Sequence, residues 1–356
     1  MPIVPLFGHA ELRGRLADAR KRGALPASIL LHGPRGVGKQ RLALWLGQLL
    51  LCDSPGDDPC GQCQHCRFVG ELRHPDLAWY FPRPRLKDSD PDLADVRGDY
   101  AEAIAERVGD EGLYPPPSGT EGIFIATVRA LVQQASMSPA LARRKTFVIG
   151  DAERMVPQEG SEQAANAFLK LLEEPPDDTT VIVTSSEPGA LLPTIRSRVT
   201  SFRVAPLPVK DVKMFIAHPP VEKRLQSEEV PSSAEERVRF AAGAPGRLLW
   251  GSEWSAAMET ATRMLDSVGK PAMRYEAAWQ QASNKARGRF ADTLDALTVA
   301  VHARARDASS RGSAKQALGA ARAMDAIEIA KERIATNVNP QLITVNLLRE
   351  LEELLA

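Results

Sequence analysis

The stretch Ser28-Ile-Leu-Leu31-His-Gly33-Pro-Arg-Gly-Val-Gly38-Lys39 decides the fold of this chain. Its first four residues are predicted to form a short buried strand, and the apolar residues 41–51 a buried helix. Between them, the glycines and Lys39 match the pattern G-x-x-x-x-G-K of a phosphate-binding loop, in the strand-to-helix context that the pattern requires. Glycines let backbone N–H groups approach a phosphate, and the helix N-terminus and Lys39 add positive charge. The sequence therefore predicts a nucleotide-binding α/β domain.

Two positions near this loop differ from those of an enzyme that hydrolyses ATP. Gln40 stands where such an enzyme carries a Ser or Thr whose hydroxyl ligates Mg²⁺. Asp151 follows an apolar strand and would hold the metal, but Ala152 comes next in place of the Glu that polarises the attacking water. Glu153 could turn inward and rescue hydrolysis, and this alternative stays open. The sequence favours a weak or absent ATPase, with ATP and Mg²⁺ possible in a degenerate site.

Two further short apolar segments extend the α/β pattern. Residues 146–149 and 180–183 are rich in β-branched or aromatic residues, and a helical pattern at 165–172 separates them. Strands that alternate with helices favour a parallel sheet covered on both faces. The predicted fold class is therefore an α/β P-loop domain.

The rest of the chain predicts helices and one insertion. Residues 12–25 read as a helix with basic residues outside an apolar stripe. Residues 82–119 are rich in Pro, Asp and Arg, with a helical stretch at 100–108, and are interpreted as a partly mobile surface insertion. Beyond residue 251 the pattern is helical, with amphipathic stretches at 255–266, 273–283, 288–306, 314–335 and 340–355. We expect an α/β domain over 1–204, a small helical domain over 205–252 and a helical domain over 253–356.

Four cysteines lie within fifteen residues, directly after the helix of the phosphate loop: Cys52, Cys60, Cys63 and Cys66. Four thiolates at such spacing suit a tetrahedral structural Zn²⁺ with no open position for catalysis. Zinc can contribute about 10 kcal/mol to the folding of small modules, enough to order a loop without an apolar core. His65 could replace one cysteine, and the alternatives are buried cysteines without metal or redox chemistry between Cys63 and Cys66.

Composition and charge exclude several classes of protein. The 356 residues are 44% hydrophobic and 25% charged, which excludes a disordered or fibrous chain. Lys+Arg and Asp+Glu are both 45, so no overall field draws the molecule onto nucleic acid or anionic lipid. The chain has no apolar run near the ~20 residues that span a bilayer, and its start lacks the pattern of a signal peptide. We expect a cytoplasmic protein without membrane contact.

Taken together, these motifs resemble the AAA+ subunits of the bacterial DNA polymerase III clamp loader, most closely those of the delta-prime type. The resemblance spans residues 8–204 and weakens beyond them. The motifs that carry it, besides the phosphate loop and the cysteines, are Asn166-Ala-Phe-Leu-Lys-Leu-Leu-Glu-Glu-Pro-Pro176, Thr194-Ile-Arg-Ser-Arg198, Gly243-Ala-Pro-Gly-Arg247 and Asn337-Val-Asn-Pro340.

The resemblance implies a subunit of a hetero-pentameric ring with gamma/tau and delta subunits, which loads a sliding clamp onto primed DNA during replication. In such a ring ATP sits between subunits, and one subunit's arginine completes its neighbour's site. That arginine corresponds to Arg198, although Val199 stands where the family pattern has Cys. The alternative for Arg198 is a surface arginine that pairs with a nearby carboxylate. The helical C-terminal domain would then form part of the collar that holds the ring together, and residues 205–252 the lid.

The resemblance also implies a set of nucleotide-site residues. Ser185 and Ser186 match the family's sensor position at a strand end, and Arg247 its sensor in the second domain. The expected nucleotide-binding residues are Gly33, Gly36, Gly38, Lys39, Gln40, Asp151, Ser185 and Arg247.

Two other functions stay open from the sequence. The first is a gamma/tau-type clamp-loader ATPase, against which Gln40 and Ala152 argue. The second is a P-loop ATPase unrelated to DNA polymerase III, which would make the motif at 166–176 and the cysteine spacing coincidental. The leading interpretation is a subunit that organises the ring and donates Arg198 to an adjacent ATPase.

Overall fold

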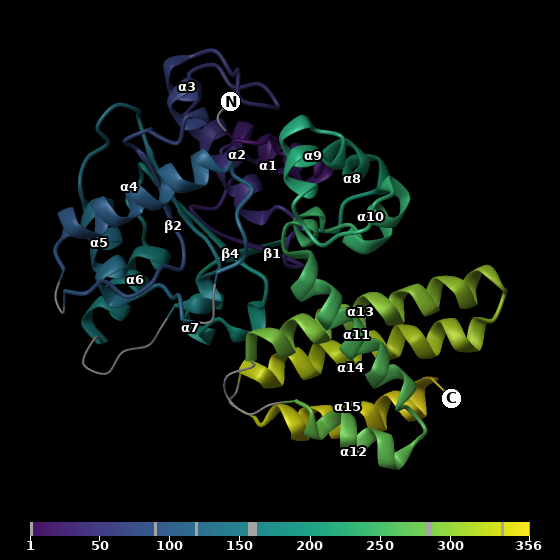
Figure 1. Cartoon of the computed structure of the whole chain (residues 1–356). Coiled ribbons are helices and arrows are strands. Elements are labelled where there is room, and N and C mark those ends of the chain that lie inside the picture. Colours follow the sequence, from purple (N-terminus) through teal and green to yellow (C-terminus); the bar gives the residue numbers. More distant parts are fainter. Residues whose placement is uncertain are drawn as a thin grey trace. The chain divides into compact units, whose positions relative to one another are not determined.

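The computed structural model describes residues 3–88, 91–117, 120–155, 162–281, 287–335 and 338–355. The chain divides into two compact units, Met1–Leu249 and Trp250–Ala356 (Figure 1). The first unit holds the sheet and all the motifs around the phosphate loop, and the second consists of helices. Asn337, the first residue of the expected motif at 337–340, lies outside the described residues.

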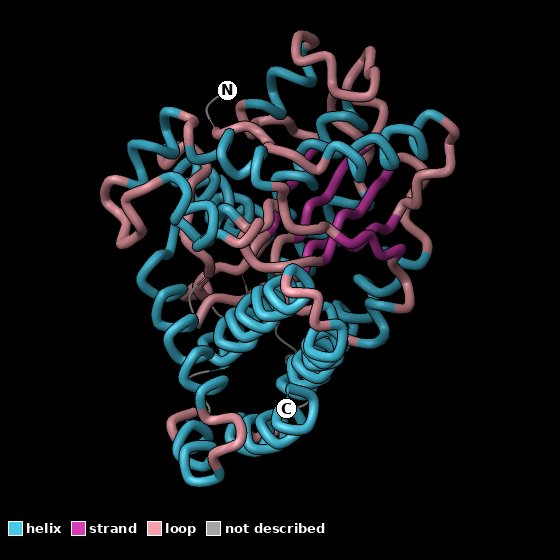
Figure 2. The backbone as a smooth tube through the Cα atoms, turned by 90° about the vertical axis from the view of Figure 1, so that its right-hand side faces the viewer, coloured by secondary structure: helices cyan, strands magenta, loops and turns pink. Residues whose placement is uncertain are grey.

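The centre of the first unit is a sheet of five parallel strands in the order β2-β3-β4-β1-β5 (Figure 2). The strands are β1 (Ser28–His32), β2 (Leu77–Tyr80), β3 (Lys145–Ile149), β4 (Thr179–Ser185) and β5 (Thr200–Arg203). In the register, Leu30 of β1 lies opposite Val183 of β4 and Ser201 of β5. All strands therefore end at one edge, where the phosphate loop follows β1.

The burial of the strands explains which of them the sequence pattern detects. Every residue of β3 and β4 is buried, as parallel strands with both faces covered require. The expected strands at 28–31, 146–149 and 180–183 are confirmed. The sequence analysis missed β2 and β5, because β2 has only four residues and β5 is an edge strand with mostly exposed polar side chains.

Helices connect these strands. They are α1 (Ala10–Lys21), α2 (Lys39–Leu51), α3 (Gln64–Gly70), α4 (Leu93–Gly109), α5 (Ile125–Ser136), α6 (Glu162–Glu173) and α7 (Pro193–Arg196), with short 3-10 helices η1 (Ala152–Arg154) and η2 (Pro188–Ala190). Helix α2 packs against β1, β3 and β4. The expected helix at 12–25 is too long, because α1 ends at Lys21 and Gly23 adopts a left-handed φ of 64°.

The expectation of a surface insertion at 82–119 is wrong. Helix α4 buries Val96, Tyr100 and Ala103 in the same core as the sheet, and the Tyr100 hydroxyl donates to the Phe81 carbonyl oxygen at 2.6 Å. Arg83, just after β2, makes two hydrogen bonds to the Asp99 carboxylate, at 3.1 and 3.0 Å. The expected helical stretch at 100–108 is the second half of α4, and the Pro, Asp and Arg residues of this segment concealed its earlier start and its apolar face.

A group of short helices follows the sheet within the first unit: α8 (Val209–Ile216), α9 (Pro219–Leu225), α10 (Ala234–Ala241) and the 3-10 helix η3 (Pro245–Trp250). Phe7, just before α1, makes an edge contact with Phe215 of α8, with ring centroids 5.7 Å apart. This group of helices therefore packs against the segment that leads into α1.

The second unit contains α11 (Gly251–Asp266), α12 (Pro271–Trp279), α13 (Arg287–Ser310), α14 (Ala314–Ala335) and α15 (Pro340–Leu355). Its core is aliphatic, with Leu294, Leu297, Ile327 and Leu348 fully buried. The helix expected over 273–283 is too long, because α12 ends at Trp279. Residues 282 and 283 of that expectation lie outside the described ranges. No helix in the described part of the chain has the length and apolar character needed to cross a bilayer.

Candidate functional site

The phosphate loop lies between β1 and α2, as its spacing predicts. Gly33, Gly36 and Gly38 adopt φ angles of 157°, 81° and 99°, which L side chains rarely adopt. A Cβ atom on Gly33 would lie 2.3 Å from the Val204 carbonyl oxygen. These glycines are therefore required by the backbone of the loop itself.

Lys39 is buried and its ammonium group is held by oxygen atoms of the protein. The Lys39 Nζ atom donates to the carbonyl oxygens of Gly33 and Pro34, both at 3.0 Å, and to the Ser186 hydroxyl at 2.8 Å. A bound phosphate would have to replace these acceptors. The loop geometry fits a phosphate. In this structure, Lys39 instead binds carbonyl oxygens of its own loop.

Gln40 occupies the position where a metal-binding hydroxyl would stand. Its Nε2 atom donates to Asp151 Oδ2 at 2.9 Å, and its Oε1 atom accepts from Trp79 Nε1 at 3.0 Å. A Cβ atom on Gly150 would lie 2.5 Å from Gln40 Oε1, so Gly150 provides the space for this amide. An amide N–H directed at the Asp151 carboxylate uses the oxygen atom that a metal ion would need.

Glu153, in η1, turns inward toward the loop. Its Oε1 atom accepts from the Ser186 backbone N–H at 3.0 Å, and its Oε2 atom is buried without a hydrogen bond from the described residues. Burial and the nearby Asp151 and Glu187 carboxylates raise the pKa of Glu153 to about 7, with Lys39 acting in the opposite direction. The side chain therefore reaches the nucleotide site in spite of its displaced position in the sequence.

The two serines at the end of β4 have different roles. The Ser186 hydroxyl contacts Lys39, whereas the Ser185 hydroxyl accepts from the Glu187 backbone N–H at 3.1 Å. Ser185 is fully buried, and its carbonyl oxygen accepts from the Gly33 N–H at 3.3 Å. Among the two, Ser186 is the one whose side chain lies at the phosphate loop.

Helix η3 lies directly against the phosphate loop. The Gly246 N–H donates to the Gly36 carbonyl oxygen at 2.9 Å, and a Cβ atom on Gly246 would lie 2.8 Å from the Gly36 Cα atom. Arg247 is buried and its Nη1 atom donates to the Ala241 carbonyl oxygen at 3.3 Å. The motif at 243–247 therefore meets the loop through its glycine backbone.

Arg198 lies at the opposite edge of the sheet from the phosphate loop. It precedes β5, whose Thr200 pairs with Ile29 near the start of β1, whereas Gly33 follows the end of β1. The Arg198 Nε atom donates to Glu173 Oε2 at 2.9 Å, and the side chain is 30% exposed. This topology separates Arg198 from the nucleotide loop of its own chain. Val199, beside it, packs against the core.

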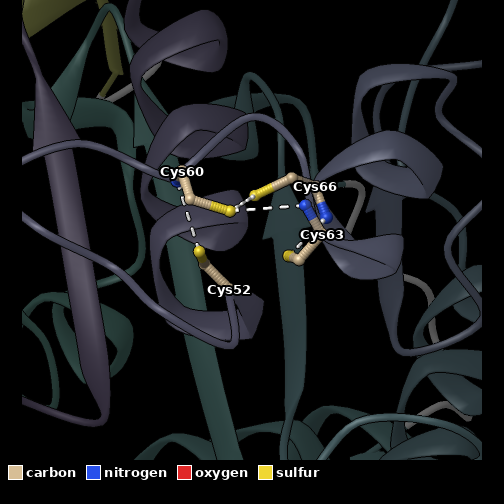
Figure 3. A group of neighbouring side chains, drawn as sticks. All are labelled: Cys52, Cys60, Cys63 and Cys66. Atoms are coloured by element: carbon tan, nitrogen blue, oxygen red, sulfur yellow. Dashed lines mark hydrogen bonds between the residues drawn. The ribbon is translucent and has the colours of Figure 1, made fainter.

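The four cysteines form a cluster at the end of α2 and the start of α3 (Figure 3). Their sulfur atoms all lie within 4.8 Å of one another. Backbone N–H groups of Cys60, Cys63 and Cys66 donate to the sulfur atoms of Cys52, Cys60 and Cys63, at 3.3, 3.4 and 3.4 Å. Such bonds lower the pKa of Cys60 to about 6. Four converging soft donors with N–H support fit a tetrahedral metal ion.

His65 points away from this cluster. Its Nδ1 atom lies 2.8 Å from His74 Nε2, and its Nε2 atom lies 3.4 Å from Asp53 Oδ1. The His74 Nδ1 atom accepts from the Asp76 N–H at 3.0 Å, which places the His74 proton on Nε2. His65 thus belongs to a chain of polar contacts with Asp53, His74 and Asp76, next to the cysteines.

Sequence reasoning missed the residues that surround Gln40. The Arg107 guanidinium of α4 stacks over Phe81 and Tyr114, with 3.3 and 3.7 Å between the guanidinium carbon and the ring centroids. Trp79 of β2 fixes the orientation of the Gln40 amide. No local motif marks these residues, because they come from a strand and a segment that sequence patterns did not place in the core.

The parallel sheet, the glycine loop at the end of β1 and the carboxylate at the end of β3 define a P-loop protein. Comparison with known proteins identifies the family within that class. The family model described as "DNA polymerase III, delta subunit" matches residues 8–208. The chain belongs to this family, and curated relatives named subunit delta' place it with the delta-prime clamp-loader proteins.

Within the aligned segments, the curated relatives are 25–30% identical to this chain. The DNA polymerase III subunit delta' of Pseudomonas aeruginosa is 30% identical over 238 residues, which are 66% of this chain and 56% of the relative. The subunit delta' of Escherichia coli is 27% identical over 249 residues, 68% and 60% of the two chains. The Escherichia coli subunit tau is 25% identical over 68% of this chain and 31% of its own.

The chain therefore spans about half the length of the curated relatives it matches. Among solved structures, a gamma subunit-related protein of DNA polymerase III from Thermotoga maritima aligns with 97% of this chain and 99% of its own. The sequence identity is 17% and the TM-score is 0.36.

Proposed function

We propose that this chain is a ring subunit of the DNA polymerase III clamp loader whose own nucleotide site does not hydrolyse ATP. The observation that carries this proposal is the Gln40 amide, which donates to Asp151 at the place where a Mg²⁺ ligand is needed. ATP hydrolysis at a P-loop depends on that metal to neutralise the developing charge. A pocket of this kind can hold phosphate through its backbone without completing the reaction.

The second part of the proposal is that Arg198 acts on the nucleotide of a neighbouring subunit. Its position at the amino edge of the sheet, away from its own loop at the carboxyl edge, supports a role in trans. An arginine supplied in trans stabilises charge on the transferring phosphoryl group and is worth roughly 10³ to 10⁵ in rate. The proposed product of the ring is mechanical: a sliding clamp placed on primed DNA.

The assignment of domains follows from the same proposal. Residues 205–252 would act as the lid of the nucleotide site, a role supported by the bond between Gly246 and Gly36. Residues 253–356 would form part of the collar that joins the ring subunits. The gamma/tau and delta subunits are the proposed partners, and the relatives named delta' and tau support that choice.

We also propose that the four-cysteine cluster holds a structural Zn²⁺ ion. Four sulfur atoms within 4.8 Å of one another, on a module with few apolar side chains, support this assignment. Zinc would tie the end of α2 to α3 and would leave no open position for catalysis.

One observation favours a second candidate function, a gamma/tau-type ATPase. Glu153 reaches the site, and a carboxylate with a pKa near 7 is suited to act as a general base at neutral pH. The two functions differ in whether the isolated chain hydrolyses ATP.

The experiment that tests the proposed role of Arg198 uses the assembled clamp loader. The full chain, as wild type or as Arg198→Ala, is mixed with the ATPase and delta subunits, and ATP turnover is measured with clamp and primed DNA. We expect the ring to form with both proteins and turnover to fall with Arg198→Ala, because one ATP site loses its arginine. Unchanged turnover in the assembled ring would show that Arg198 has a different role.

A further inference from the structure

The Arg198 side chain is held by three acceptors from its own chain. Its Nε atom donates to Glu173 Oε2 at 2.9 Å, and its Nη1 atom to the Thr194 carbonyl oxygen at 3.1 Å and the Ser197 hydroxyl at 3.4 Å. Among the described residues, no hydrogen bond from the Nη2 atom is seen. The guanidinium is thus oriented by its own chain and still has N–H groups to offer to a ligand.

The two partners of the Glu173–Arg198 pair are placed by rigid elements. Glu173 is the last residue of α6, and Arg198 follows the short helix α7, which packs against α6. Ile195 of α7 is 2% exposed and belongs to the core of the sheet domain, so it anchors the turn that carries Arg198. The relative position of the Glu173 and Arg198 side chains is therefore set by the packing of α6 against α7.

We propose that Glu173 is a positioning residue for the trans action of Arg198. The inference rests on the proposed function, because Glu173 can position Arg198 for catalysis only if Arg198 reaches the nucleotide of a neighbouring subunit. Glu173 binds the guanidinium through Nε, and the Nη2 atom keeps N–H groups that make no hydrogen bond among the described residues. A planar guanidinium fixed in advance loses less side-chain freedom when it meets a phosphate.

The exposure of the pair fits this task. The side chain of Arg198 is 30% exposed and that of Glu173 is 58% exposed, so a neighbouring subunit has access to both. An ion pair this exposed adds little to the stability of the chain itself. Its value would lie in the orientation of Arg198, and its loss is expected to change turnover more than folding.

Glu174 offers a matched control, because it is the next residue and is also exposed. The test compares Glu173→Ala, Glu174→Ala, Arg198→Ala and the double variant Glu173→Ala/Arg198→Ala in the assembled clamp loader. Turnover at saturating ATP is measured per assembled ring, and the melting temperature of each free chain is measured beside it. Glu173→Gln, which keeps an acceptor oxygen, serves as the second variant if Glu173→Ala fails to enter the ring.

We expect Glu173→Ala to lower turnover about two- to fivefold, the scale of an exposed charge pair, with Glu174→Ala at the wild-type rate. In the Arg198→Ala background, Glu173→Ala should have no further effect, because its only route to the reaction is gone. A loss of equal size in that background would mark a merely structural role and overturn the proposal. Increased turnover would also overturn it, because Glu173 would then restrain Arg198.

The two proposals fail in different ways. If Arg198→Ala leaves turnover unchanged, the proposed function of Arg198 fails, and the proposal for Glu173 fails with it. If Arg198→Ala lowers turnover and Glu173→Ala does not, the role of Arg198 stands and the positioning role of Glu173 alone is contradicted.

Discussion

A glutamine amide does not replace a threonine hydroxyl at a magnesium site. The hydroxyl offers its oxygen to the metal, whereas Gln40 directs an N–H donor at the Asp151 carboxylate and gives its own oxygen to Trp79. The Gln40 oxygen also accepts from the Tyr114 hydroxyl at 3.5 Å, so contacts at both ends of the amide hold it in one orientation. Glutamine at position 40 in place of Ser or Thr thus removes one metal ligand. Its amide also binds the Asp151 carboxylate, which would provide a second ligand.

Glu153 leads to a prediction about pH and stability. Its pKa is raised from 4.5 to about 7, so the folded protein holds this proton more tightly than the unfolded chain does. The free energy of unfolding therefore falls as pH rises from about 4.5 to 7, by at most about 3 kcal/mol from this group. We expect Glu153→Gln, which cannot lose a proton, to lack this fall.

Urea unfolding of the wild type and of Glu153→Gln between pH 5 and 8 measures the difference. The advantage of the variant should grow with pH and level off above about 7. A difference that does not change with pH would contradict the buried position of the Glu153 carboxyl group.

Individual residues were predictable where a motif fixes their backbone. Gly33, Gly38 and Lys39 lie where the loop pattern places them, and the sequence left the direction of Glu153 open. Trp79 and Arg107 carry no such signal, because their contacts with the site depend on a strand and a helix far away in the sequence. The distinction between Ser185 and Ser186 lies in the partners of their hydroxyls, Glu187 and Lys39, and needed the structure.

At the scale of elements, the proposed zinc ion would hold the cysteine module more than apolar packing does. Cys60 is exposed, Cys63 is half-buried, and the loop before them contains mostly polar residues. We expect about one zinc per chain by metal analysis of the purified protein, and a large loss of zinc with Cys60→Ser, because a tetrahedral site loses one of four ligands.

His65→Ala is the control for this measurement, since His65 lies in the same module and bonds to His74 instead of the cysteines. It should keep its zinc. Folded wild-type protein without bound metal would contradict the assignment.

Helix α4 leads to a second prediction about an element. Tyr100 is buried, packs edge-on against Tyr80 and Phe81, and donates to the Phe81 carbonyl oxygen. Tyr100→Ala should lower the free energy of unfolding by about 3–5 kcal/mol, as for other buried aromatic residues. Glu102→Ala, on the exposed side of the same helix, should change it by less than about 0.5 kcal/mol. Equal stability of the two variants in urea would mean that α4 is not part of the core.

The elements with a strong apolar period were predictable, whereas β5 was missed and only the part of α4 at 100–108 was expected. The central strands β1, β3 and β4 and the long helices of the second unit follow from their patterns. The edge strand β5 has exposed polar side chains, and α4 has a narrow apolar face within a Pro- and Asp-rich segment. In both, the surrounding structure decides the conformation more than the local sequence does.

At the scale of the whole molecule, we propose that the two edges of one sheet carry two separate tasks. The carboxyl edge carries a phosphate loop whose metal site is replaced by a Gln40–Asp151 hydrogen bond. The amino edge carries Arg198 and Glu173, which we propose act on the nucleotide of a neighbouring subunit. With 45 basic and 45 acidic residues, the chain has no general attraction for DNA, so contact with primed DNA would depend on the assembled ring.

The most direct test is steady-state ATP hydrolysis by the purified chain alone with Mg²⁺, compared with its Lys39→Ala variant. We expect neither protein to turn over ATP above background, because Gln40 offers no hydroxyl to Mg²⁺ and its amide binds the Asp151 carboxylate. Robust Mg²⁺-dependent hydrolysis by the wild type that disappears with Lys39→Ala would contradict this expectation.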